Sequence, residues 1–164
     1  VDCVDGDTKV LTVERKHVPV RSFKAGDLIL SFTRKKYVVR RVLEVVHTPA
    51  VSADRLCRIT FDGAEDVVAT RNHPFFVKGK KWTAVSPSDQ NVVKAKQLEV
   101  GDVCVDMDGK AVRVTGIKDM PSNTSQDVFN ILIESPGTWF ANSVLCHSGI
   151  RAVINGKENI SNNV

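Results

Sequence analysis

Two eight-residue segments of the sequence share the same pattern of residue types: Phe23–Leu30 (FKAGDLIL) and Leu98–Val105 (LEVGDVCV). Each copy has an apolar residue, two further residues, a Gly-Asp pair and then a strand-like run. Downstream of the two copies, residues 39–63 align on residues 111–135 without a gap, at an offset of 72. Apolar alternation alone explains part of this second match, but the two copies also share their turn residues. We therefore expect a duplicated β unit and a pseudo-twofold fold.

Strand signals dominate the rest of the chain. Short runs of β-branched or alternating residues are separated by turn pairs such as Asp62-Gly63 and Asp108-Gly109. Only Asp89–Gln97 has the character of a short helix or a helical turn. Many short, closely spaced strands favour an all-β fold, a sandwich or barrel-like assembly, over alternating α/β structure. The predicted strands are Lys9–Val13, Asp27–Thr33, Tyr37–Val46, Leu56–Phe61, Asp66–Thr70, Phe75–Val77, Gly101–Asp106, Ala111–Ile117, Val128–Glu134 and Ser143–Cys146.

Composition indicates an ordinary globular protein. The chain has 164 residues, 42% of them hydrophobic and 26% charged, which suits one domain with a real core. It contains no apolar run of the roughly 18 to 20 residues that span a bilayer, so we expect no membrane partner. The first residues are neither basic nor apolar, so we expect no signal peptide. The sequence does not otherwise identify a compartment.

The basic residues do not form a nucleic-acid site. The net charge is only +4, and the short basic runs Arg34-Lys35-Lys36 and Lys78-Gly79-Lys80-Lys81 flank predicted strands without interleaved aromatic residues. We interpret these runs as solvated hairpin tips and expect no nucleic-acid partner. The alternative, a basic β-barrel that binds nucleic acid, predicts salt-dependent binding and no role for any cysteine.

The four cysteines are Cys3, Cys57, Cys104 and Cys146, and none of them forms a CxxC pair. This spacing excludes a zinc ribbon and a thioredoxin-like motif. Two disulfides are arithmetically possible, but a disulfide at Cys3 would silence it if it is catalytic. We interpret the cysteines as reduced thiols, which favours a reducing compartment, with Cys57 and Cys104 as small core residues.

Three segments carry residues suited to chemistry. They are Cys3–Thr8 (CVDGDT), Thr70–Pro74 (TRNHP) and Phe140–Ser148 (FANSVLCHS). Each half of the duplicated unit ends near a histidine, His73 in the first and His147 in the second. A pseudo-twofold fold would bring these two ends together at one centre.

Together with Phe129-Asn130-Ile131, these segments resemble the Hint superfamily, which includes inteins, bacterial intein-like domains and Hedgehog autoprocessing domains. That family opens with a Cys followed by a Gly-Asp-Thr turn and carries a Thr-x-x-His motif in its first half, matched here by Thr70 and His73. Its second half has a Tyr/Phe-Asp-Leu strand and a Phe-Ala-Asn-Gly-x-Leu-x-His-Asn ending. The four motifs occur in the family's order and cover Cys3 to Ser148.

The resemblance implies an all-β Hint fold, a horseshoe-like pseudo-twofold assembly over residues 3–148. Residues 1–2 are then an N-terminal flank. We expect residues 149–164, which hold four asparagines and little large apolar surface, to be a flexible C-terminal flank outside the domain. The substrate implied is the domain's own flanking polypeptide, processed once and in cis, and we expect a monomer.

The expected chemistry starts at Cys3. A thiol beside a peptide carbonyl can move the acyl group from nitrogen to sulfur, which turns an amide into a thioester. A free cysteine has a pKa of about 8.5, so the thiol needs local activation. By resemblance, Cys3 attacks the Asp2–Cys3 bond and His73 protonates the departing nitrogen. Also by resemblance, Thr70 hydrogen-bonds to that bond and helps to stabilise the oxyanion.

The chain departs from the family's splicing members at its end. Ser148 stands where those members have the Asn that cyclises, and a serine has no carboxamide with which to form a succinimide. Gly149 has no side-chain nucleophile. His147 is present, but the reaction that it would assist lacks the asparagine side chain that acts as its nucleophile. Asn130 replaces an expected Asp, and Gly137 stands near an expected His. We therefore expect N-terminal cleavage or acyl transfer to water, small thiols or amines. Ser148 fits either a natural variant or a trapped precursor.

A catalytically silent Hint scaffold or a zinc-binding module is the alternative function. Cys3, His73, Cys146 and His147 supply thiolate and imidazole ligands of the kind that zinc prefers. Neighbouring residues of one strand point to opposite faces, which argues against joint binding by Cys146 and His147. We expect no catalytic cofactor, and zinc, if bound, to inhibit by occupying Cys3.

Overall fold

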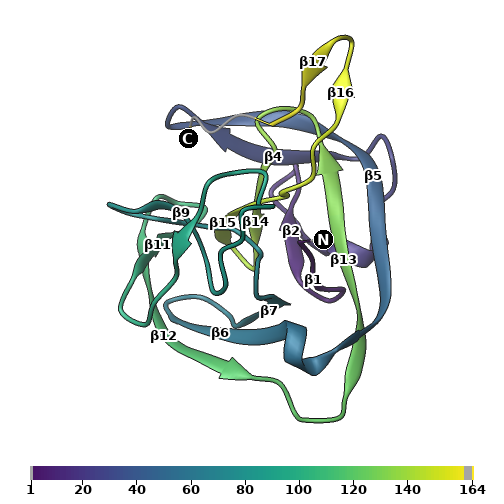
Figure 1. Ribbon diagram of the computed structural model, residues 1–164. Helices are drawn as coiled ribbons and strands as arrows, with labels where there is room; N and C mark the ends of the chain where they lie inside the picture. Colours follow the sequence, from purple (N-terminus) through teal and green to yellow (C-terminus); the bar gives the residue numbers. More distant parts are fainter. Residues whose placement is uncertain (1, 161–163) are drawn as a thin grey trace.

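Strands form almost all of the regular structure of the chain (Figure 1), seen in a computed structural model that describes residues 2–160 and 164. Within these residues, the helical elements are two 3-10 turns, and no helix is long and apolar enough to cross a membrane. The turns are η1 (Val20–Ser22) and η2 (Ala53–Arg55). The strands are β1 (Val4–Asp5), β2 (Lys9–Leu11), β3 (His17–Pro19), β4 (Leu28–Thr33), β5 (Lys36–Ser52), β6 (Leu56–Asp62), β7 (Val67–Thr70), β8 (Phe75–Val77), β9 (Lys81–Ala84), β10 (Lys96–Gln97), β11 (Val103–Val105), β12 (Ala111–Asp119), β13 (Ser125–Ile133), β14 (Thr138–Ala141), β15 (Val144–His147), β16 (Val153–Ile154) and β17 (Lys157–Glu158).

The expected all-β architecture is confirmed. In the described part of the chain, one 15-stranded sheet runs in the order β3-β2-β14-β15-β8-β11-β12-β6-β7-β1-β13-β5-β4, with β9 and β10 joined at β8. Each of the ten predicted strand segments overlaps an observed strand. The prediction missed the short strands β1, β3, β9, β10, β14, β16 and β17, because two to four residues are too few to show a hydrophobic period.

Strands of the two halves pair across the pseudo-twofold unit. In the sequence alignment at an offset of 72, β12 corresponds to β5 and β13 corresponds to β6. In the sheet, however, β5 pairs antiparallel with β13, and β6 pairs antiparallel with β12. Figure 1 shows the first of these pairs as two long ribbons that run side by side. Each half therefore completes the other, and neither buries its apolar face alone.

The repeated Gly-Asp turns make the same contacts. Val42 exchanges two backbone hydrogen bonds of 2.8 Å with Gly26-Asp27, and Val114 exchanges two of 2.8 Å with Gly101-Asp102. Val42 and Val114 are partners in the alignment at an offset of 72. Both turn glycines have a φ of +96°, a region that a residue with a Cβ adopts only at a cost. The sequence repeat is therefore a repeat of structure.

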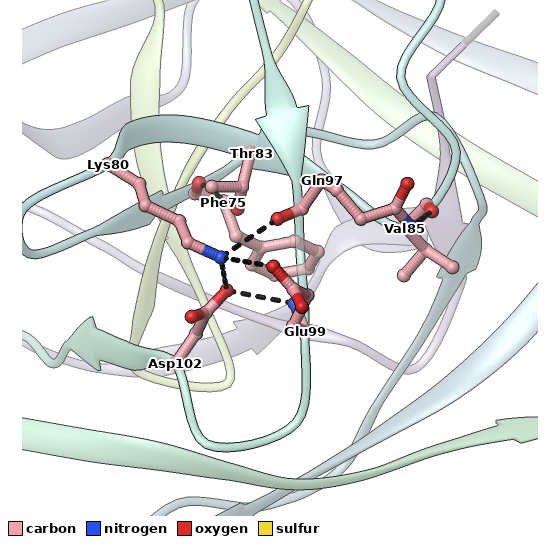
Figure 2. Close-up of polar contacts among 7 residues, drawn as sticks. All are labelled: Phe75, Lys80, Thr83, Val85, Gln97, Glu99 and Asp102. Atoms are coloured by element: carbon pink, nitrogen blue, oxygen red, sulfur yellow. Dashed lines mark hydrogen bonds and ion pairs between the residues drawn. The ribbon is translucent and has the colours of Figure 1, made fainter.

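Lys80 strengthens the second turn, although the sequence suggested that its basic run is a solvated tip. Its ammonium group donates to Glu99 Oε1 and Asp102 Oδ2, both at 2.9 Å, and to the Gln97 carbonyl oxygen at 3.2 Å (Figure 2). The Asp102 carboxylate also accepts the backbone N–H of Glu99 at 2.8 Å. The Asp102 hydrogen bond in particular raises the pKa of Lys80. Lys80 therefore ties the turn between β8 and β9 to the turn before β11.

In Asp89–Gln97, expected to be a short helix or a helical turn, the structure has a turn at residues 89–90 and no helix. The last two residues of this segment form β10, which pairs parallel with β9. The Asn91 side chain accepts the backbone N–H of Ser88 at 2.7 Å and donates to the Asn72 carbonyl oxygen at 2.9 Å. Side-chain bonds of this kind compete with the helical ladder and favour turns.

The segment after residue 149, which composition predicts to be a flexible flank, contains two short strands. Strands β16 and β17 form a separate antiparallel hairpin, which projects at the top of Figure 1. Asn159, only 2% exposed, anchors it by donating to the carbonyl oxygens of Ile133 at 2.9 Å and Ile150 at 3.1 Å. It also accepts the backbone N–H of Ala152 at 2.6 Å. Residues 1 and 161–163 of the predicted flanks lie outside the described residues.

Candidate active site

Strand β1 brings Cys3 into the centre of the sheet. Val4 pairs with Ala69 of β7 on one side and with Phe129 of β13 on the other, so the preceding residue lies between these two strands. Cys3 is fully buried, and its side chain lies in a small apolar cluster with Val51, Leu56 and Val128. The nucleophile predicted from sequence is therefore enclosed by strands from both halves.

Thr70 lies against the nitrogen side of the Asp2–Cys3 bond. Its hydroxyl oxygen accepts the Cys3 backbone N–H at 3.0 Å and donates to the Cys3 carbonyl oxygen at 3.3 Å. The Thr70 backbone N–H also donates to that carbonyl oxygen, at 2.9 Å. The structure thus places Thr70 at the predicted bond, but on its leaving nitrogen and not on the Asp2 carbonyl oxygen. In this geometry the Thr70 hydroxyl is engaged on the nitrogen side of the bond, and its expected oxyanion role stays a prediction.

Asn130 of β13 contacts the carbonyl that Thr70 leaves open. Its side-chain amide donates to the Asp2 carbonyl oxygen and to the Ser148 carbonyl oxygen, both at 2.5 Å. Its own oxygen accepts the backbone N–H of Ile131 at 2.8 Å, which sets the orientation of the amide. A carboxamide has two N–H groups, whereas an ionised carboxylate only accepts. The replacement of the expected Asp by Asn130 therefore supplies donors that an ionised carboxylate lacks.

His73 lies in an apolar pocket just after Thr70. Its backbone N–H donates to the Thr70 carbonyl oxygen at 3.0 Å. The centroid of its ring lies 5.3 Å from that of Phe75 and 6.1 Å from that of Trp139, both in T-shaped arrangements. Burial, with a smaller contribution from His147, lowers the pKa of His73 to about 3. Neither ring nitrogen has a hydrogen-bond partner among residues 2–160 and 164. The imidazole is therefore neutral near pH 7, and burial disfavours its protonated form.

The end of β15 forms the other side of the site. His147 Nδ1 accepts the backbone N–H of Gly149 at 3.0 Å, and the His147 ring lies 5.1 Å from the Trp82 ring. Ser148 is fully buried, and its backbone N–H donates to the Gly137 carbonyl oxygen at 2.9 Å. The Ser148 hydroxyl has no hydrogen-bond partner in the described part of the chain. The predicted ends of the two halves do meet at one centre.

The Hint module family model matches residues 1–155. The chain belongs to the Hint family. The all-β fold and the resemblance inferred from the four motifs are thereby confirmed. No similar sequence was found among curated proteins.

Solved structures of similar fold are inteins and an intein-like domain. A bacterial intein-like domain from Clostridium thermocellum has 24% sequence identity and a TM-score of 0.73, and the match covers 90% of this chain and 99% of that one. A DnaB intein from Synechocystis sp. PCC 6803 has 16% identity and a TM-score of 0.72, with coverages of 92% and 100%. The gp41-1 intein has 18% identity and a TM-score of 0.69, with coverages of 90% and 98%. At these identities the likeness establishes the fold alone.

The thiol of Cys3 is protonated in this Hint domain. Burial raises the pKa of the Cys3 thiol, and the hydroxyl of Thr48, 3.8 Å from the sulfur, offsets part of this effect. The other three thiols are free and buried as well. Burial raises the pKa of Cys57 to about 11 and that of Cys104 to about 12, and it also raises the pKa of Cys146. These thiols lie in the main hydrophobic core of the domain and are inert there.

The sequence placed Asp2 at the predicted bond but did not predict that its side chain is buried in the site. Asp2 is only 6% exposed, and burial raises the pKa of its carboxyl from 3.8 to about 7. One of its carboxylate oxygens has no hydrogen-bond partner within the described residues. An acidic residue beside the nucleophile was visible in the sequence, but its burial depends on the fold.

The zinc hypothesis receives no support from side-chain positions. In the part of the chain that the structure describes, no three His, Cys, Asp or Glu residues gather closely enough to hold a metal ion. The thiols of Cys3 and Cys146 lie in two different apolar clusters. Inhibition by zinc stays a prediction for this Hint domain.

Proposed function

We propose that this Hint domain processes its own N-terminal junction, through an N-to-S acyl shift at the Asp2–Cys3 bond. The Hint fold supports autoprocessing in general. The observation that carries the specific proposal is the pair of contacts on this one peptide bond. Thr70 accepts its N–H at 3.0 Å, and Asn130 donates to its carbonyl oxygen at 2.5 Å.

The first step needs a base, because the buried Cys3 thiol is protonated. The neutral imidazole of His73 offers an unprotonated ring nitrogen for this proton, but its lowered pKa makes it a weak base and its conjugate acid a strong acid. The role of His73 is therefore mainly to protonate the departing nitrogen. Cys3 sulfur then attacks the Asp2 carbonyl carbon, and the carbonyl oxygen becomes an oxyanion. Asn130 already donates to that oxygen, in the manner of an oxyanion-hole donor.

The second step breaks the carbon–nitrogen bond. The proton that His73 took from sulfur passes to the Cys3 nitrogen, whose N–H is oriented by Thr70. The products are a thioester between Asp2 and Cys3 and a free α-amine on Cys3. The proton balance closes within the site, so this step needs no external acid. Water, a small thiol or an amine then takes the acyl group from sulfur.

The C-terminal reaction has no comparable groups. The Ser148 hydroxyl cannot form a succinimide, and Gly149 offers no side-chain nucleophile to receive an acyl group. The proposal is therefore limited to N-terminal cleavage or acyl transfer, with the flanking polypeptide as substrate.

The test is the intact mass of a fusion with a longer N-terminal flank, incubated near pH 7 with and without dithiothreitol. We expect a cut between Asp2 and Cys3 that is faster with the thiol and absent in Cys3→Ala. The matched control is Cys57→Ala, which removes a buried thiol of the core and is expected to leave the cleavage in place. An unchanged mass over days, with the fold intact, would support a silent scaffold.

A further inference from the structure

The carboxyl group of Asp2 occupies the place of a side chain at residue 149. A Cβ atom built on Gly149 would lie 1.8 Å from Asp2 Oδ2 and 2.8 Å from Asp2 Cγ. Even the Asp2 Cβ atom would be 3.3 Å away. Contacts below 3.0 Å do not occur between real atoms of this kind. The two flanking residues, one at each junction, therefore compete for the same space.

The backbone around this contact is held on both sides. The Asn130 amide donates to the carbonyl oxygens of Asp2 and Ser148, so it ties the two junctions to one side chain. The Gly149 N–H is bonded to His147 Nδ1 at 3.0 Å. Neither main chain can withdraw without losing a buried hydrogen bond, which is costly in a site that excludes water.

The Asp2 side chain has little room to turn away. It is 6% exposed, so a rotation about its Cα–Cβ bond would carry the carboxyl into packed atoms. No hydrogen bond from the described residues holds its Oδ2 atom, so steric fit and not a polar partner determines where it lies. The size of the side chain at residue 2 is thus the quantity that matters for residue 149.

We propose that residues 2 and 149 are a mutually exclusive pair, in which the site accommodates a side chain at one position or the other but not at both. The last residue of the N-terminal flank then determines whether the first residue of the C-terminal flank can be anything but glycine. The consequence for flank selection rests on the proposed function, whereas the steric exclusion itself does not. Asp2 thus restricts residue 149 to glycine.

The test is a double-substitution cycle on thermal stability, made in a Cys3→Ala chain that cannot form the thioester. The four chains carry the original pair, Gly149→Ala, Asp2→Gly, or both substitutions. Gly149 has a φ of +65°, so alanine costs stability there in either background, about 2–8 °C in melting temperature from the backbone alone. We expect a drop at least twice as large when Asp2 is present as when Gly replaces it.

The matched control is Gly109→Ala. Gly109 also has a positive φ, +77°, but nothing lies within 4 Å of its built Cβ atom. Its drop in melting temperature is expected to be the same with Asp2 and with Asp2→Gly. If Gly149→Ala prevents folding only in the presence of Asp2, the proposal is supported. Equal drops in both backgrounds, or a failure to fold in both, would overturn it.

The two proposals fail in different ways. Stability coupling in the Cys3→Ala chains, together with no cleavage in the chains that retain Cys3, leaves the exclusive pair and removes the acyl shift. Cleavage in the chains that retain Cys3, without stability coupling in the Cys3→Ala chains, supports the acyl shift and removes the exclusive pair. In chains that retain Cys3, we expect cleavage to persist with a larger residue at position 149 only when Gly replaces Asp2.

Discussion

At the scale of single residues, one amide connects the two junctions of this domain. Asn130 lies between the carbonyl oxygens of Asp2 and Ser148 and donates to both. A side chain that stabilises charge developing on a carbonyl oxygen contributes more in a dry site than in water. Asn130 is therefore the residue on which the proposed reaction depends most, after Cys3 and His73.

Asn130→Ala removes the donor from the Asp2 carbonyl oxygen. We expect thiol-induced cleavage to slow by roughly 10²- to 10³-fold, the usual effect of losing one oxyanion-hole donor. The measurement is the single-turnover rate from intact mass, with melting temperature recorded in parallel. Asn142→Ala serves as the control, because the Asn142 side chain donates to the Asp66 carbonyl oxygen and accepts the Lys9 N–H, away from the scissile bond. An unaltered rate in a folded Asn130→Ala chain would remove Asn130 from the mechanism.

The buried carboxyl of Asp2 predicts a pH dependence of stability. Its pKa is raised from 3.8 to about 7, so between these values the folded state binds a proton that the unfolded state does not. Stability therefore falls as pH rises through this window, and the full cost is present above pH 7. Asp2→Asn abolishes this cost. In the Cys3→Ala background we expect the variant to be more stable by about 2–4 kcal/mol at pH 8 and equally stable near pH 4.

Urea unfolding of the two chains at both pH values checks this prediction. His73 acts in the opposite direction, because its pKa is lowered by burial and the unfolded state binds the extra proton below about pH 6.5. That effect is common to both chains and cancels in their difference. A stability difference of equal size at pH 4 and pH 8 would show that burial of the Asp2 charge is not its cause.

At the scale of elements, the repeated Gly-Asp turns are the most regular feature. Gly26 and Gly101 have the same φ, and a Cβ atom on either would have nothing within 4 Å. Asp27 closes the first turn by accepting the Lys24 N–H at 2.9 Å, as Asp102 does for its own turn at 2.8 Å. The turns therefore differ mainly in what surrounds them, above all in the contacts of Lys80 with the second.

Gly26→Ala and Gly101→Ala should each destabilise the fold through the backbone alone. We expect about 1–2 kcal/mol for each, equal within about 0.5 kcal/mol, and near-additive in the double variant. Urea unfolding of the two single variants and the double variant provides the numbers. Markedly unequal losses in the free energy of unfolding would contradict the expectation that the two turns, which make the same contacts, contribute equally to stability.

At the scale of the whole molecule, the fold arises from exchange between the halves. Strands β5 and β6 of the first half pair with β13 and β12 of the second, so the sheet closes only when both are present. Strand β1 is inserted between β7 and β13 and carries Cys3 into the centre. The candidate active site is therefore assembled from both halves, with Thr70 and His73 from one and Asn130 and Ser148 from the other.

The sequence by itself determined the all-β class, ten of the strand segments, the duplication, and the residues of the short motifs, Cys3, Thr70 and His73 among them. These features are local, because turn chemistry and side-chain alternation act within a few residues. The hairpin after residue 149 and the absence of a helix at Asp89–Gln97 were not predictable, since side-chain hydrogen bonds of Asn159 and Asn91 to distant backbone groups override weak local preferences.

Only the tertiary structure decided how the site is assembled. The contact from Asn130 to Asp2 spans 128 positions in the chain, and the contact from Asp2 to Gly149 joins its two ends. Which donor faces which carbonyl, and which side chain fills the remaining space, depends on packing among strands from both halves. No local pattern encodes such contacts, because their free energy appears only when the sheet brings distant segments together and excludes water from between them.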